Sequence, residues 1–381
     1  MSAWAGCLST QVTVKILKFA PKEIMNSNSI NSPPAGVTAK ESEGFSKASL
    51  GNLIRRPETG SFIGLVCVFV FFSIFGGETF LSVSGFASWL NIAAELGIIA
   101  LPIGLLMIAG HLDLSIGSVI PASSMTVAIV SGHYGFPLPV GIISALALGL
   151  AVGFVNGYLI VRTDLPSFVV TLATLFAVAG LTLGLSVILA GSTSVALKSD
   201  PITKMVFGDF IDGKFEVILL WWVAAMLFIG YILGHSKYGN WILALGGDKV
   251  SARNAGIPTD KLNIALFMGS GLCAAFVGMC QAILYNSAQV SAGQSFIFNS
   301  IIAVVIGGVI LTGGYGSVVG IVLGTMTFAI VNQGIYYTGF DANWASLIIG
   351  ILLLAAVLLN NTFRAMAISH AAPRIKPKAI K

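Results

Sequence analysis

The longest stretch of this sequence without a charged residue constrains its fold more than any other feature. Between Lys261 and Asp341 lie 79 residues with no Asp, Glu, Lys, Arg or His, and between Asp113 and Arg162 lie 48 residues in which His133 is the only one of these types. A membrane-crossing helix needs about 20 apolar residues, so each stretch holds more than one crossing. Lipid offers the backbone no hydrogen bonds, which leaves helices or closed barrels. The apolar runs lack the period-two alternation of barrel strands, so we expect helices.

Composition extends this conclusion to most of the chain. Hydrophobic residues make up 56% and charged residues 9% of the 381 residues, whereas soluble domains carry about 25% charged residues. The sequence therefore predicts an all-α polytopic membrane protein with about ten transmembrane helices. We expect the crossings near residues 61–82, 91–110, 116–132, 138–160, 168–191, 217–235, 262–286, 300–312, 315–338 and 344–360. The eighth is short, which favours a re-entrant or broken helix.

Basic residues predict how the chain is oriented. The tail 1–60 holds seven basic residues, the tail from Arg364 holds five, and the loop 236–261 holds four. With ten crossings these three regions share one side, which the positive-inside rule makes cytoplasmic. The loop 192–215, with three Lys and three Asp, then lies outside. We expect a bacterial inner-membrane protein with both termini in the cytoplasm.

Three regions follow from this layout. Residues 1–60 are predicted to be a disordered cytoplasmic tail, in which Met25 offers an alternative start and residues 1–24 a mis-called one. Residues 61–362 form the transmembrane domain, and residues 363–381 form a basic cytoplasmic tail. Within the domain, Gly149-x-x-x-Gly153-x-x-x-Gly157 and Gly316-x-x-x-Gly320-x-x-x-Gly324 predict close helix packing inside one chain in preference to a dimerisation motif.

Polar side chains on the apolar segments are candidates for a solute pathway. Asp113 or Ser115 can cap a helix that begins near Ile116; an ionisable group near membrane depth is also often functional, and we leave both interpretations open for Asp113. The roles of Glu95 and His111 stay open as well. Uncharged groups either line a wet path or tie helices together. The candidate pathway set is Asp113, Ser115, Asn156, Phe168, Thr171, Thr174, Asn286, Gln289 and Asn332.

The cytoplasmic loop carries a second signal. Asp248 is a helix N-cap residue, residues 249–255 make about two turns, Gly256 is a stop and Pro258 blocks continuation. A short capped helix of this kind can dock into a groove of a soluble partner, although a solvated connector is the plainer alternative. The candidate coupling set is Gly246, Gly247, Asp248, Ala252, Arg253, Gly256 and Ile257.

The absence of several motifs excludes several classes of enzyme and of metal-binding protein. The sequence has no G-x-x-x-x-G-K-[ST] phosphate loop, nucleophile elbow or dinucleotide fingerprint, and its four cysteines have neither zinc spacing nor a disulfide framework. We therefore expect a protein that is not an enzyme, with no cofactor, no metal and no nucleic-acid partner.

Four motifs in the same order resemble the ribose/xylose-type permease family of ABC sugar importers, over about residues 60–365. They are Gly110-His-Leu-Asp-Leu-Ser-Ile-Gly117; Asn156-Gly157 with Pro166-Ser-Phe168 and Thr171-Leu-Ala-Thr174; Gly246-Gly247 with Ala252-Arg253 and Gly256-Ile257; and Ile302 to Gly308 with Gly313-Gly-Tyr-Gly316. His111 and Ala173 each replace a glycine of the family pattern.

The resemblance implies a complex of two permease chains, two cytoplasmic ATPase subunits and a periplasmic sugar-binding protein. Segment 248–256 would be the coupling helix, and the substrate would be a monosaccharide or related polyol. The alternatives are an ABC permease for branched-chain amino acids or nucleosides and, from another class, an ion-coupled secondary transporter. Neither the sugar nor the choice between homodimer and heterodimer follows from the sequence.

Overall fold

The computed structural model describes residues 58–339 and six further positions between 347 and 358. All of them belong to one compact unit, residues 47–381. The expected tenth crossing, 344–360, and the two predicted tails fall largely or wholly outside the described residues.

Eight helical segments within the described residues are long and apolar enough to cross a bilayer. They are α2 (Glu58–Phe75), α4 (Val83–Ile108), α5 (Ile116–Val127) continued by the π-helix η1 (Ala128–His133), α6 (Leu138–Thr163), α7 (Ser167–Ala190), α9 (Ile218–His235), α12 (Thr259–Tyr285), and α14 (Val318–Gly334) continued by the 3-10 helix η2 (Ile335–Tyr337). This confirms the all-α polytopic membrane fold.

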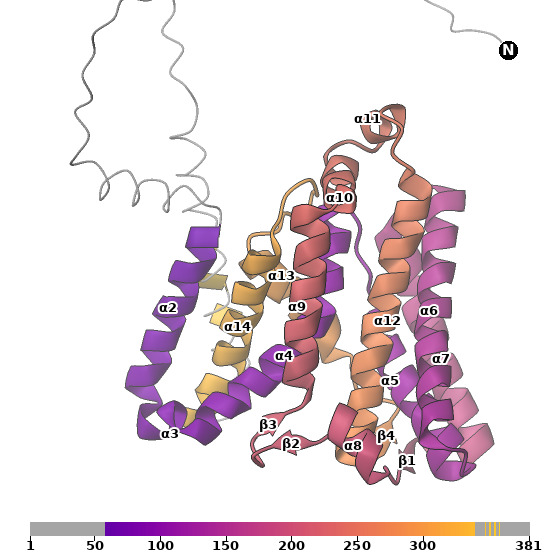
Figure 1. Cartoon of the computed structure of the whole chain (residues 1–381), viewed down its shortest axis with the longest axis vertical. Helices are drawn as coiled ribbons and strands as arrows, with labels where there is room; N and C mark the ends of the chain where they lie inside the picture. Colours follow the sequence, from indigo (N-terminus) through magenta and orange to yellow (C-terminus); the bar gives the residue numbers. More distant parts are fainter. Residues whose placement is uncertain (1–57, 340–346, 348–349, 352–353, 356–357, 359–381) are drawn as a thin grey trace, which may run out of the picture. The chain divides into compact units, whose positions relative to one another are not determined.

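Short elements gather at the two ends of these helices (Figure 1). At one end lie α10 (Lys237–Gly247) and α11 (Lys249–Asn254); we call this the α11 end. At the opposite end, the strand end, lie α3 (Gly77–Leu81), α8 (Pro201–Phe207) and two antiparallel strand pairs, β1 (Ser194–Ala196) with β4 (Ser287–Gln289) and β2 (Phe210–Ile211) with β3 (Phe215–Glu216). The loops 236–261 and 192–215 therefore lie on opposite sides, as the basic-residue count predicts.

Three predicted boundaries are wrong. The first crossing does not run from 61 to 82, because the chain turns at Gly76 and Gly77, which has φ +57°, and continues as α3. The second begins at Val83 instead of 91, because Ser82 caps it by accepting a hydrogen bond from the Gly85 N–H at 3.1 Å. The eighth helix, α13, spans Ser295–Ile306 instead of 300–312, because the chain leaves the helix at Gly307 and Gly308, which has φ +87°.

The short helix α13 is half of a broken crossing. Its 12 residues span about 18 Å at 1.5 Å per residue, less than the roughly 30 Å of a bilayer core. The chain enters it shortly after β4 at the strand end. The chain is not helical again until Val318. Within this segment the Gly314 N–H donates to the Ile108 carbonyl at the end of α4, 2.8 Å away.

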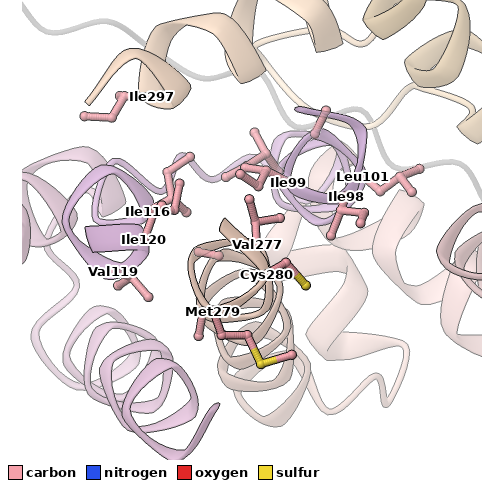
Figure 2. Close-up of a cluster of buried hydrophobic side chains, with 14 of the residues drawn as sticks. Ile98, Ile99, Leu101, Ile116, Val119, Ile120, Val277, Met279, Cys280 and Ile297 are labelled. Atoms are coloured by element: carbon pink, nitrogen blue, oxygen red, sulfur yellow. The ribbon is translucent and has the colours of Figure 1, made fainter. Parts of the chain in front are cut away.

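The core lies between α4, α5, α12 and α13. Figure 2 shows apolar side chains from these helices converging, among them Ile99, Ile120, Val277 and Ile297, and all four are buried. By contrast, α7 has few buried residues, namely Val170, Thr171, Thr182 and Ser186, as expected for a helix whose outer face contacts lipid.

The two glycine repeats pack helices together within one chain. A Cβ on Gly153 would collide with the Phe267 carbonyl of α12, and one on Gly157 would come within 2.7 Å of the Ile264 Cα. Gly320 and Gly324 of α14 approach Gly307 and Ala303 in the same way. The prediction of intramolecular packing is confirmed for both repeats.

Candidate functional site

A chain of hydrogen bonds passes through the irregular segment between α4 and α5. The Asp113 carboxyl accepts from the Ser115 N–H at 3.0 Å and the Ser115 hydroxyl at 2.6 Å through Oδ1. Its Oδ2 accepts from the Ser270 hydroxyl of α12 at 2.7 Å. The Asn156 amide of α6 donates to Ser115 Oγ at 2.9 Å, and Thr174 of α7 donates to Asn156 Oδ1 at 2.6 Å. We call these five residues the polar clamp.

The polar clamp ties helices together at a buried place. Asp113, Ser115 and Ser270 are each 1% exposed and Asn156 is 0% exposed, so no solvent competes for these bonds. The clamp joins α6, α7 and α12 to one segment. Neither Asp113 nor Ser115 caps α5: Ser115 occupies the N-cap position, but its side chain accepts no hydrogen bond from an α5 N–H. The capping prediction is wrong because the Asp113 carboxyl turns back to Ser115 and across to α12.

Two other pathway candidates lie on the first turns of α7. Thr171 is buried and donates to the Ser167 carbonyl at 2.9 Å, while the Ser167 hydroxyl accepts from the Leu112 N–H at 3.0 Å. Phe168 is 48% exposed. The Thr171 hydroxyl also lies within hydrogen-bond distance of the Leu112 carbonyl, at 3.4 Å, and so extends the tie between α7 and the Asp113 segment, whereas Phe168 lies outside it.

The last three pathway candidates lie towards the strand end. Asn286 has φ +50° after α12, and its Oδ1 accepts from the Ser199 N–H at 3.4 Å. Gln289 is exposed on β4, where it pairs with Ser194. Asn332 is partly buried near the end of α14. Eight of the nine candidates therefore divide into an Asp113 group of five and a strand-end group of three, and Phe168 belongs to neither.

Sequence reasoning missed Ser270, which provides the clamp's bond to α12. It also did not foresee that Glu95 of α4 accepts a hydrogen bond from the Gln281 amide of α12 at 3.0 Å. Ser270 lies between Gly269 and Gly271 and looks like one more small packing residue, so its only signal was a hydroxyl on a buried face.

The cytoplasmic helix predicted at 249–255 is present as α11. Asp248 caps it by accepting from the Ser251 N–H at 2.6 Å, and this backbone hydrogen bond holds the pKa of the Asp248 carboxyl below its usual value. At the other end Gly256 has φ +83°. The Gly256 N–H bonds the Arg253 carbonyl at 3.0 Å and the Ile257 N–H bonds the Ala252 carbonyl at 3.2 Å, which is a Schellman motif.

The coupling candidates present two faces. Ala252 is 3% exposed and holds α11 to the protein. Arg253 points outward and pairs with Asp260 at 3.0 Å, while Lys249 pairs with Asp164 at 3.9 Å. Exposed pairs of this kind contribute about 0–1 kcal/mol, so their charges are free to serve a partner at little cost in stability.

Gly246 and Gly247 lie at the C-terminal end of α10. A Cβ on Gly246 would collide with the Ile108 carbonyl, so this glycine is required by a close approach of two backbones. A Cβ on Gly247 would meet nothing within 4 Å. In the part of the chain that the structure describes, no three His, Cys, Asp or Glu side chains are grouped as metal ligands would be.

Comparison with known proteins identifies the class. Residues 85–357 match the family described as the branched-chain amino acid transport system/permease component. The chain is 29% identical over 318 residues to the fructose import permease protein FrcC of Rhizobium meliloti, covering 82% of this chain and 87% of that one. It is 30% identical over 267 residues to the ribose import permease protein RbsC of Escherichia coli K12, covering 69% and 81%. It is 28% identical over 358 residues to the xylose transport system permease protein XylH of Haemophilus influenzae, covering 79% and 95%.

The family match covers well over half of the chain, and the chain therefore belongs to this family of ABC transporter permease components. It is a multi-pass membrane protein and a transport component, not an enzyme. Among solved structures, PsaBC from Streptococcus pneumoniae aligns with a TM-score of 0.41 at 16% identity, over 78% of this chain and 95% of that one.

Proposed function

We propose that this chain is the membrane-spanning subunit of a binding-protein-dependent ABC importer that carries a monosaccharide or related polyol across a bacterial inner membrane. The observation that carries the proposal is α11. It is a helix capped at both ends, held to the protein through Ala252 and exposed through Arg253, and it lies beyond the membrane-crossing helices on the side with excess basic residues.

The roles of the partner subunits follow from what the sequence of this chain lacks. The chain has no phosphate-binding loop, so ATP would be hydrolysed by cytoplasmic partner subunits that grip α11. Their closure would move the helices between inward-open and outward-open arrangements, with two permease chains forming the route. A periplasmic binding protein would deliver the solute at the strand end, where Asn286 and Gln289 are exposed.

A neutral, hydroxylated substrate fits the described helices. Within the crossing helices that the structure describes, Lys and Arg occur only in terminal turns, as Arg162 and Lys261 do. None of these helices therefore offers a Lys or Arg at depth to pair with a carboxylate substrate. The relatives named for fructose, ribose and xylose point the same way. The family description favours a second candidate, a branched-chain amino acid permease. The ligand bound by the cognate binding protein separates the two.

Reconstitution tests the proposal. Proteoliposomes containing this chain, its ATPase subunits and the loaded binding protein are expected to accumulate labelled sugar only when ATP is inside the compartment that holds the ATPases. Proteoliposomes with this chain alone should accumulate nothing under a proton gradient. Robust accumulation by the chain alone would overturn the proposal in favour of an ion-coupled carrier.

A further inference from the structure

Three segments that are far apart in the sequence meet through glycine backbones at the α11 end. They are Gly110 just after α4, Gly246 in the last turn of α10, and the pair Gly313 and Gly314 in the loop between α13 and α14. We call this meeting point the glycine joint. Gly313 has φ +86° and Gly110 has φ +85°, a region that side chains other than glycine rarely adopt.

The contacts in the joint are made by main chains. A Cβ on Gly246 would collide with the Ile108 carbonyl oxygen and with the Gly314 nitrogen. A Cβ on Gly313 would come within 2.8 Å of the Gly246 carbonyl oxygen and 3.0 Å of the Gly110 Cα. Real Cβ atoms almost never approach other heavy atoms within 3.0 Å, so a side chain at either position would force the segments apart.

The joint is also held by a hydrogen bond, in addition to the close approach of the backbones. The last carbonyl groups of a helix have no partner within that helix. For α4, one of them, the Ile108 carbonyl, accepts from the Gly314 N–H at 2.8 Å. A contact between side chains can adjust when they change rotamer. A direct contact between two main chains cannot adjust in this way. Sliding one segment past the other would break this bond.

The joint lies between the partner-facing helix and the helices that must move. On one side, α10 runs directly into Asp248 and α11. On the other side, Gly110 is followed within three residues by Asp113, whose polar clamp holds α6, α7 and α12. Displacement of α11 therefore reaches three crossing helices through the chain itself, the close backbone contact at Gly246 and the hydrogen bonds of the polar clamp.

We propose that the glycine joint is a rigid connector that makes the α10–α11 hairpin, the end of α4 and the 307–317 loop move as one body, with Gly246 as a positioning residue for transport. The inference rests on the proposed importer function. Gly246 is the informative position because it lies in α10 with an ordinary helical φ. Replacing it with alanine introduces no backbone strain and acts only by separating the segments.

The first test compares Gly246→Ala with Gly234→Ala in the complex with its ATPase subunits. Gly234 lies in α9, and a Cβ there would meet nothing within 4 Å. The readouts are sugar uptake and the ratio of ATP hydrolysis with loaded binding protein to hydrolysis without it. Mutations along coupled elements change coupling by factors of about two to thirty. We expect a loss of this size in both readouts for Gly246→Ala, and none for Gly234→Ala.

Equal sugar uptake by the two variants would refute the proposal that the glycine joint couples the segments. A wild-type complex that shows no ATP-driven uptake would instead refute the importer function itself, so the two failures are distinguishable.

The second test remains decisive even if Gly246→Ala fails to assemble. It leaves every glycine of the joint in place. In a chain whose native cysteines are replaced, Val250→Cys on α11 and Leu311→Cys in the 307–317 loop put spin labels at two exposed positions. A rigid joint predicts the same distance between the labels in the assembled complex with and without ATP. If ATP changes that distance, the two segments move separately and the proposal is wrong.

Discussion

Replacing Ser270 with alanine tests whether the polar clamp holds α12 to the rest of the domain. The Ser270 hydroxyl donates to Asp113 Oδ2 at 2.7 Å, and both side chains are 1% exposed. The substitution removes one oxygen atom and leaves that carboxyl oxygen without its donor. A buried polar group that loses its partner costs about 1–3 kcal/mol, so we expect Ser270→Ala to destabilise the protein by about that amount.

The assay is thermal unfolding in detergent, followed by the loss of monodisperse protein on size exclusion. A cost of about 1–3 kcal/mol lowers the unfolding midpoint by about 2–10 °C for a domain of this size. The matched control is Ser144→Ala. Ser144 is only partly buried on α6 and donates to the Val140 carbonyl of its own helix at 2.8 Å, so its loss should stay within about 0.5 kcal/mol. Equal midpoints for the two variants would refute the clamp as a tie between helices.

Three further predictions follow from the same contacts. Gly153→Leu should prevent purification of a stable protein, because a Cβ at 153 meets the Phe267 carbonyl. Gly180→Leu on the exposed face of α7 should be tolerated, because a Cβ at 180 meets nothing within 4 Å. The yield of monodisperse protein checks both. Gly256→Ala should lower stability by about 1–2 kcal/mol, the cost of a side chain in a left-handed conformation, measured by the same unfolding midpoint. Arg253→Ala should leave that midpoint within about 0.5 kcal/mol of wild type and weaken copurification of the ATPase subunits; unchanged copurification would show that Arg253 does not face them.

Local signals in the sequence were sufficient for much of the fold. Charge-free runs of the required length predicted the crossings. The single crossing 217–235 between loops 192–215 and 236–261 predicted that these loops lie at opposite ends. The capping residues Asp248 and Gly256 predicted α11, because a cap is a property of a few neighbouring residues. Glycine spacing predicted which faces of α6 and α14 pack closely.

Tertiary contacts lay beyond the reach of these signals. Nothing adjacent to Asp113 shows that its carboxyl bonds Ser270, which is 157 residues away in the sequence, so the sequence left a helix cap and a pathway role equally open. Likewise, the motifs around Gly110, Gly246 and Gly313 are each visible in the sequence, but the sequence does not show that they meet in one joint. The eighth crossing was placed about five residues late because apolar residues continue past Gly307, although the helix does not.

The sidedness of α11 tests the central claim most directly, since an ATPase can grip this helix only from the cytoplasm. Val250 on α11 is 67% exposed, and Ile202 on α8, at the strand end, is 77% exposed. Each residue is changed to cysteine in a chain without native cysteines. Membranes that contain the variant are then treated with a membrane-impermeant maleimide. We predict that Val250→Cys is labelled in inside-out vesicles and protected in spheroplasts, with the reverse for Ile202→Cys. Labelling of Val250→Cys in intact spheroplasts would place α11 outside the cell and contradict the account.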